Sequence, residues 1–338
     1  MNLKKIFYII ATLGFVFLGI FVSLSLYYRL DNSFFKIVFI SIFLFSSTIT
    51  IVSFRLKHFR LVSWGFYLVF LAVWLFWYKS IEPSNERDWQ RDVAVLSYAT
   101  RENNLVKFHN IRNFKYITEY EYKISYYDET FDINKLNGID FITTYWMGKN
   151  IAHTFLSFSF SDNKHLAISV EARKEMGASY SALRGFFKDS ELIYVVADER
   201  DLIGLRTNIR KNPPEYVYMY QIDAKLKDKQ KIFLSYVEKI NELQKRPKYY
   251  NTLTRNCTTS IWSNSLVNYP NLKINWEIFL TGYSANYLYD NKLLKSHGLS
   301  FKELKRNSFI NPLVDDKPID SSYSIDIRSI SWAGIGLE

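Results

Sequence analysis

The chain has 338 residues, of which 48% are hydrophobic and 22% are charged, and its formal net charge is +10. The basic balance does not indicate nucleic-acid binding, because no run of five like charges occurs and basic residues beside a membrane more often meet anionic lipid headgroups. One cysteine, Cys257, is present, which excludes an intramolecular disulfide.

Residues 1–80 are mostly apolar and contain three long hydrophobic runs, at residues 6–28, 37–54 and 61–78. Each run is close to the roughly 20 residues with which a helix crosses a bilayer core of ~30 Å. The first run follows Lys4 and Lys5 as a signal peptide would, but it exceeds the apolar signal core of about 7–15 residues and no small-residue cleavage site follows it. The pattern therefore predicts a three-helix membrane anchor over residues 1–80.

Basic residues in the short loops predict the orientation of this anchor. Lys4 and Lys5 precede the first run, and Arg55, Lys57 and Arg60 lie between the second and third. Because cytoplasmic loops are enriched in Lys and Arg, we expect the N-terminus in the cytoplasm of a bacterial-type inner membrane. Residues 81–338 then form a periplasmic domain.

Residues 81–338 have the composition of a globular domain, and no linker divides them. Apolar runs at 151–160 and 165–172 flank a polar turn, which predicts a β-hairpin. Residues 89–98 fit a helix or a strand equally well, and residues 120–131 fit a surface hairpin or a loop. Further strands are predicted at 106–117, 192–196 and 216–222, and helices at 228–243, 257–266 and 283–294. The fold class is α+β, an antiparallel sheet with helices packed on it.

Cys257 is the first candidate for chemistry. Asn256 is suited to cap a helix that begins at Cys257. The positive end of a helix lowers the pKa of a thiol and favours the nucleophilic thiolate, and the free N–H groups of Cys257 and Thr258 are suited to hold an oxyanion. A small buried side chain without chemistry is the alternative for a lone cysteine.

A cysteine nucleophile needs a base, and His153 is the candidate. The chain has five histidines; His58 falls in the predicted cytoplasmic loop, whereas His153 lies in a hydrophobic strand, where an imidazole needs a partner. Taken alone, a histidine in a strand is more often structural than catalytic. No spacing of Cys and His residues fits a metal site, so neither a metal nor another cofactor is expected.

Five segments carry a resemblance to a known family: GKNIAHTFLSF at 148–158, SVEARKE at 169–175, VADERDL at 196–202, YNTLTRNCTTSIW at 250–262 and WEIFLTGYSANYLYDNKLL at 276–294. Together they resemble the DUF4105 family, also called the Lnb-type periplasmic domain, from about residue 92 to residue 327. The resemblance implies a papain-like, permuted NlpC/P60-like fold in which a histidine strand precedes an Asn-Cys helix start. It also implies a lipoprotein N-acyltransferase, which moves an acyl chain from the diacylglyceryl group of a lipoprotein onto the α-amine of its N-terminal cysteine.

The resemblance favours Cys257 as nucleophile and His153 as base, and several residues receive secondary roles. Glu171 is expected to orient His153, although a solvent-facing strand carboxylate fits equally well. Arg173 could bind a lipid headgroup, but a surface salt bridge is the more common role. Tyr145 and Trp146 could line an acyl pocket, or simply belong to the core.

The sequence leads to a Cys–His acyltransferase whose partners are membrane lipids and a lipoprotein substrate. One alternative is a thiol hydrolase acting on cell-wall peptides or lipids, which would use an open polar groove. Another is an anchored binding module without catalysis, which predicts that Cys257 and His153 lie far apart or that Cys257 is sealed in apolar packing. A lipid enzyme instead predicts an apolar slot.

Overall fold

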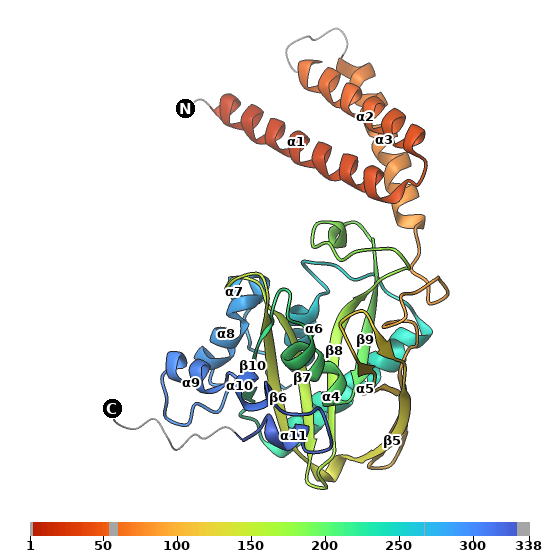
Figure 1. The fold of residues 1–338 in the computed structure, drawn as a ribbon. Coiled ribbons are helices and arrows are strands. Elements are labelled where there is room, and N and C mark those ends of the chain that lie inside the picture. Colours follow the sequence, from red (N-terminus) through yellow and green to blue (C-terminus); the bar gives the residue numbers. More distant parts are fainter. Residues whose placement is uncertain (1–2, 54–59, 267, 330–338) are drawn as a thin grey trace. The chain divides into compact units, whose positions relative to one another are not determined.

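The structure is a computed structural model that describes residues 3–53, 60–266 and 268–329. The chain forms two compact units (Figure 1). We call residues 1–84 with 180–190 the anchor unit, and residues 85–179 with 191–338 the sheet unit. Each is described by itself.

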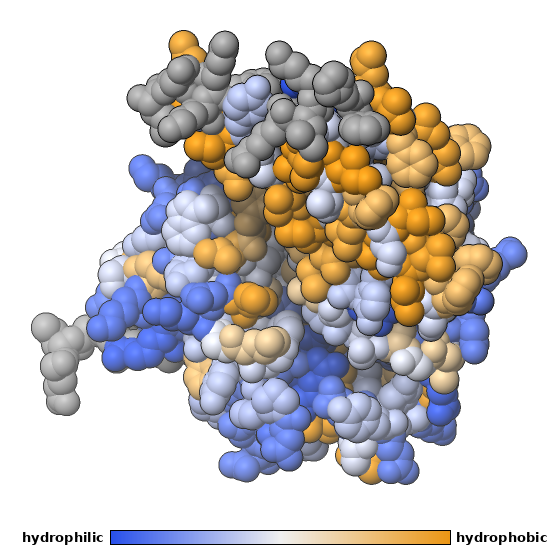
Figure 2. Space-filling view, turned by 90° about the horizontal axis from the view of Figure 1, so that it is seen from above, coloured by the Kyte–Doolittle hydropathy of each residue, from blue (hydrophilic) through white to orange (hydrophobic). Residues whose placement is uncertain are grey.

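The anchor unit contains three long helices, α1 (Leu3–Arg29), α2 (Ser33–Ser53) and α3 (Arg60–Ser80). Within the described residues, all three are long and apolar enough to cross a membrane, as the sequence predicted. Hydrophobic residues dominate their surface (Figure 2). Polar groups between the helices bond to each other, and the indole N–H of Trp74 on α3 donates to Ser25 Oγ on α1 at 2.8 Å. Such pairing is required where no water can serve as a partner.

The sheet unit is built on a mixed sheet in the order β1-β2-β9-β8-β7-β6-β10, with β5 also paired to β2. Every pairing is antiparallel except β2–β9, which is parallel. A separate small pair joins β3 to β4. The strands are β1 (Tyr98–Glu102), β2 (Leu105–Arg112), β3 (Lys115–Tyr116), β4 (Tyr122–Lys123), β5 (Tyr126–Asp132), β6 (Leu136–Tyr145), β7 (His153–Phe160), β8 (His165–Arg173), β9 (Glu191–Ala197) and β10 (Tyr216–Gln221).

Short helices connect these strands, and two longer ones pack on them. The elements are α4 (Glu199–Leu202), the π-helical turn η4 (Leu205–Ile209), α5 (Leu226–Lys245), α6 (Cys257–Ser265), α7 (Trp276–Phe279), η5 (Thr281–Tyr283), α8 (Ser284–Asp290), α9 (Phe301–Asn307), α10 (Asn311–Val314) and α11 (Tyr323–Asp326). The predicted α+β class is therefore confirmed. The parallel β2–β9 pair makes the sheet mixed instead of purely antiparallel.

Apolar side chains of β7 alternate between two cores, because successive strand residues point to opposite faces. Leu156, Phe158 and Phe160 pack with α5 and α6, and the rings of Phe158 and Phe233 lie 5.2 Å apart. Phe155 points to the other face, where α4, α10 and α11 cover the sheet. A strand that is buried on both faces is apolar on both, which explains the continuous hydrophobic run that the sequence shows there.

The predicted hairpin at 151–172 is confirmed, since β7 and β8 pair antiparallel with Phe155 opposite Ser169. Residues 89–98 form neither a regular helix nor a long strand. Their backbone bonds to the end of β8, with Gln90 N–H donating to the Lys174 carbonyl at 2.9 Å. The strand predicted at 106–117 ends at Arg112, after a register shift at Asn110, whose φ is 62°. The helix predicted at 283–294 ends at Asp290.

The loop before β7 is held by the segment that follows α7. Gly282 N–H donates to the Asn150 carbonyl at 3.0 Å, and Ala152 N–H donates to Thr281 Oγ1 at 2.9 Å. A Cβ at Gly282 would lie 2.1 Å from the carbonyl oxygen of Lys149. Only glycine therefore allows this approach, which fixes the position of His153, the first residue of β7.

Replacing this glycine tests the packing. We expect Gly282→Ala to lower the free energy of unfolding of the full chain by about 1–3 kcal/mol, since backbone must move to admit the methyl group. Thermal unfolding followed by circular dichroism measures the change. Gly65→Ala is the matched control, because nothing lies within 4 Å of a Cβ built at that helical position. Equal melting temperatures for the two variants would contradict the assigned contact.

Candidate active site

Cys257 is the first residue of α6, and its position is fixed by a helix cap. Asn256 Oδ1 accepts from Thr259 N–H at 2.8 Å, and Thr259 Oγ1 accepts from Asn256 N–H at 2.9 Å. This reciprocal capping box leaves the N–H groups of Cys257 and Thr258 without an intrahelical partner. Cys257 is only 6% exposed, so its sulfur lies in a nearly dry environment beside the positive end of the helix.

His153 lies at the start of β7, where the thiol of α6 meets the sheet. Thr154 points toward α6, and its Oγ1 lies 3.0 Å from Thr258 Oγ1. His153 points to the opposite side, and its ring centroid is 5.8 Å from that of Phe155. At the strand end the imidazole still lies close enough to the Cys257 thiol for each group to shift the pKa of the other. The predicted pair, 104 residues apart in sequence, is thus adjacent in space.

The two groups shift each other's proton affinity. Burial would raise the pKa of the Cys257 thiol, but the hydrogen bond and positive charge of His153, with hydrogen bonds from Thr154, lower it to about 7. Burial would lower the pKa of His153, but its hydrogen bond to Cys257 and the charges of Cys257 and Glu171 raise it to about 9. Between these values the pair exists as thiolate and imidazolium, the form that is ready for nucleophilic attack.

Ser169 and Glu171 hold the other side of the imidazole. His153 Nε2 lies 2.7 Å from Ser169 Oγ, and that hydroxyl donates to Glu171 Oε1 at 2.9 Å. The direct distance from His153 Nε2 to Glu171 Oε1 is 3.6 Å. Ser169 was missed from the sequence; its signal was its position two residues before Glu171, on the same face of β8.

Glu171 is kept ionised by Arg206. Burial would raise the pKa of Glu171, but its hydrogen bond to His153 and the charge of Arg206 keep it well below its usual value. Arg206 Nη2 lies 3.3 Å from Glu171 Oε1, and Arg206 Nη1 donates to the Leu202 carbonyl at 2.7 Å. Arg206 is 5% exposed and lies over the ring of Phe155. The sequence contained no specific sign of this arginine.

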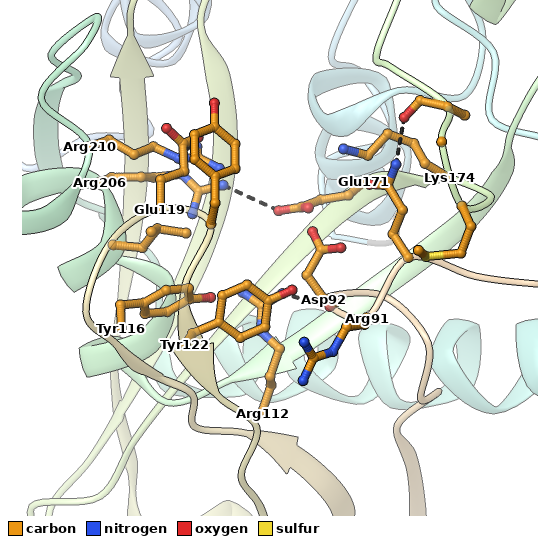
Figure 3. Close-up of a pocket in the computed structure, with 16 residues that line it drawn as sticks. Arg91, Asp92, Arg112, Tyr116, Glu119, Tyr122, Glu171, Lys174, Arg206 and Arg210 are labelled. Atoms are coloured by element: carbon orange, nitrogen blue, oxygen red, sulfur yellow. Dashed lines mark hydrogen bonds and ion pairs between the residues drawn. The ribbon is translucent and has the colours of Figure 1, made fainter.

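Glu171 also lines a polar cleft of about 450 Å³, in which it lies between Arg206 and Lys174 (Figure 3). Its walls come from the segment before β1, from β2, from the end of β8 and from η4. Charged and tyrosine side chains predominate, among them Arg91, Asp92, Tyr122, Lys174 and Arg210. Among the described residues, no group of three or more His, Cys, Asp or Glu side chains is arranged to hold a metal ion.

The remaining predicted site residues are Arg173, Tyr145 and Trp146. Arg173 is 2% exposed, donates to the carbonyls of Val93 and Ala94 and stacks on Trp89 at 4.2 Å, so its contacts are internal. Tyr145 is buried and donates from its hydroxyl to the Gly282 carbonyl at 2.7 Å, which helps to hold the loop before His153. Trp146 is half-buried beside it.

The thiol pKa can be tested by alkylation. The rate at which iodoacetamide modifies Cys257 should rise with pH and reach half its plateau near pH 7, because the thiolate is the reacting form. His153→Ala removes the group that stabilises the thiolate, but the thiol stays buried. Because burial raises the pKa of a thiol above its ordinary value of about 8.5, the midpoint of alkylation should move above pH 8.5. An unchanged midpoint in that variant would exclude the hydrogen-bonded pair.

The chain was compared with known protein families, with curated proteins and with solved structures. Residues 122–284 match the family model of the Lnb N-terminal periplasmic domain. The comparisons with curated proteins and with solved structures gave no match. The matched range contains His153, Ser169, Glu171 and Cys257. The match over residues 122–284 agrees with the family resemblance that the sequence motifs predicted.

Proposed function

We propose that this membrane protein is a Cys–His acyltransferase that acts at the membrane–water surface. It transfers an acyl chain from the diacylglyceryl group of a lipoprotein to the α-amine of the lipoprotein's N-terminal cysteine. The observation that carries the proposal is that Cys257, at the start of α6, and His153 lie close enough to shift each other's pKa. This geometry argues against an inert binding module, for which the two groups would lie apart.

In the first half-reaction the Cys257 thiolate attacks the ester carbonyl of the donor and forms the S–C bond. The charge that develops on the carbonyl oxygen is held by the N–H groups of Cys257 and Thr258, neither of which donates to another group among the described residues. The ester C–O bond then breaks, and the His153 imidazolium gives its proton to the departing glycerol oxygen. The products are an acyl-thioester on Cys257 and a lyso-glyceryl group.

In the second half-reaction the acceptor amine attacks the thioester carbonyl. His153, now neutral, accepts a proton from the amine, the C–N bond forms, and Cys257 leaves as thiolate. An α-amine has a pKa of about 7.7–8.0, so a useful neutral fraction exists near pH 7. The Glu171–Arg206 pair keeps a fixed negative charge behind the ring and so supports the imidazolium in both steps.

Exposed apolar residues near His153 support a lipid substrate. Trp276, Phe279 and Leu280, at and just after α7, are 54%, 41% and 43% exposed. Met147 and Ile151, in the loop held by Gly282, are 68% and 48% exposed. We call these five residues the apolar rim. Large apolar side chains gathered on one surface mark lipid or protein contacts, and the anchor keeps the sheet unit beside a membrane.

A crevice next to the nucleophile is a weaker argument for a lipid. It starts at Thr258 and is lined mainly by apolar residues of α6, α7 and α8, including Ile261, Trp262 and Ile278. Its volume of about 20 Å³ holds about one water molecule and no acyl chain. The rim, rather than this crevice, is therefore the feature that favours a lipid. The predicted orientation of the anchor would place the reaction on the periplasmic face of the inner membrane.

The polar cleft beside Glu171 favours a second candidate, a thiol hydrolase that cleaves peptides with the same pair. The two candidates share the first covalent step and differ in what attacks the acyl-enzyme. An acyltransferase passes the acyl group to an amine, whereas a hydrolase passes it to water. Product analysis with and without an amine acceptor separates them.

Trapping the intermediate tests the nucleophile. Incubation of the full chain with a diacylglyceryl lipopeptide whose amine is blocked should add one acyl mass at Cys257, detected by mass spectrometry of the digested protein. The adduct should be absent from Cys257→Ala and should form about 10²–10⁴-fold more slowly in His153→Gln, the usual contribution of a general acid–base. If folded Cys257→Ala transferred the acyl chain at an unchanged rate, Cys257 could not be the nucleophile.

Substitutions in the apolar rim test the lipid-facing role. Phe279→Glu with Leu280→Glu should reduce activity on substrate embedded in vesicles roughly tenfold, because two partly exposed apolar side chains contribute about 1–2 kcal/mol on burial in lipid. Activity on a short, water-soluble ester should stay unchanged. Ile325→Glu is the control, since Ile325 is 64% exposed on α11, at the other end of the sheet unit from α7 (Figure 1). Equal losses on both substrates would point to misfolding instead.

A further inference from the structure

The polar cleft contains charged groups that the proposed chemistry does not use. Three of its arginines are neutralised within the protein. Arg112 pairs with Asp201 at 2.8 Å, Arg206 with Glu171 at 3.3 Å, and Arg210 with Glu215 at 2.5 Å. Glu119 in turn pairs with Arg210 at 2.9 Å. These pairs build the walls, and they join three arginines to four carboxylates, so none of the three arginines is left unpaired.

Three further charged side chains reach the cleft without such a partner. Within the described part of the chain, Arg91, Lys174 and Asp92 form no ion pair, and all three line the cavity (Figure 3). Arg91 lies over the ring of Tyr122, 5.9 Å from its centroid. Tyr120, which also lines the cleft, is 88% exposed. The free groups thus offer two positive charges, one negative charge and aromatic faces.

The sheet order places this cleft on the opposite side of the reacting pair from the apolar rim. The cleft is lined from β2, η4 and the end of β8, whereas the rim belongs to the loop between β6 and β7 and to α7. β7, which carries His153, lies between β8 and β6. A substrate with an apolar part and a polar part can therefore lie across the pair, with each part in a matching environment.

We infer that the cleft binds the polypeptide part of the substrate, the residues that follow the acceptor amine, and that it favours an acidic side chain among them. This inference rests on the proposed function. A peptide offers backbone donors and acceptors along its length, which suits a cleft with both signs of charge, and about 450 Å³ is within the range of about 300–1,000 Å³ usual for ligand sites. Arg91 and Lys174, which form no ion pair within the described part of the chain, are the groups that select the acidic residue.

Charge reversal at the two free cations tests the inference. The full chain in detergent is given two diacylglyceryl lipopeptides that differ only in an acidic or a basic residue near the amine, and a peptide-free ester. In Arg91→Glu with Lys174→Glu, KM for the acidic lipopeptide should rise roughly tenfold, as expected for two exposed ion pairs, and the basic lipopeptide should become the better substrate. Acylation of Cys257 by the peptide-free ester should not change. Lys302→Glu, exposed on α9 outside the cleft, is the matched control.

Direct binding separates failure of this inference from failure of the proposed function. Anisotropy of a fluorescent acidic lipopeptide is measured on Cys257→Ala, with and without the two charge reversals. Weaker binding of the acidic lipopeptide after the two charge reversals supports peptide binding in the cleft, whether or not the protein transfers an acyl group. Equal binding, or equal KM values for the acidic and basic lipopeptides in the unchanged protein, would overturn it. Loss of acylation by the peptide-free ester in the double variant would also overturn it, by showing a general defect.

Discussion

A positive imidazole in a nearly dry site needs a nearby negative charge, and the arrangement around His153 follows from that requirement. Cys257 supplies one charge and Glu171 the other, and Glu171 is in turn held by Arg206. Each added group compensates the desolvation of the one before it. Removing any member leaves an uncompensated charge beside Phe155 and the buried strands, so the network supports the fold as well as the proposed chemistry.

The same network connects the regions of opposite polarity on either side of it. Glu171 lines the polar cleft, while the loop before His153, which Gly282 holds at Asn150, contributes Met147 and Ile151 to the apolar rim. The proposed acyl transfer between a lipid ester and a peptide amine would require both environments within reach of one sulfur. Tethering to a membrane raises the local concentration of such a substrate, so a modest intrinsic affinity for either part would suffice.

The reacting pair is assembled from segments with different local determinants. The helix start depends on the Asn256–Thr259 capping box, which is formed within four consecutive residues. The strand start depends on a close backbone contact that only Gly282 permits. Because both local devices converge on one point, a small shift of either would separate the sulfur from the ring, and catalytic geometry of this kind tolerates little displacement.

The sequence by itself determined the features that depend on neighbouring residues. The three apolar runs predict helices that could span a membrane by their length and apolar composition. The apolar runs on either side of residues 161–164 specify the hairpin, and Asn256 before Cys257 specifies the helix start. Motif resemblance added the pairing of His153 with Cys257. Only the tertiary structure decided that Ser169 bridges His153 to Glu171, that Arg206 neutralises this carboxylate, and that Arg173 is turned inward. Those contacts join β7, β8 and η4, segments whose packing depends on side-chain shape and on the parallel β2–β9 pairing, and neither leaves a periodic signal in the chain.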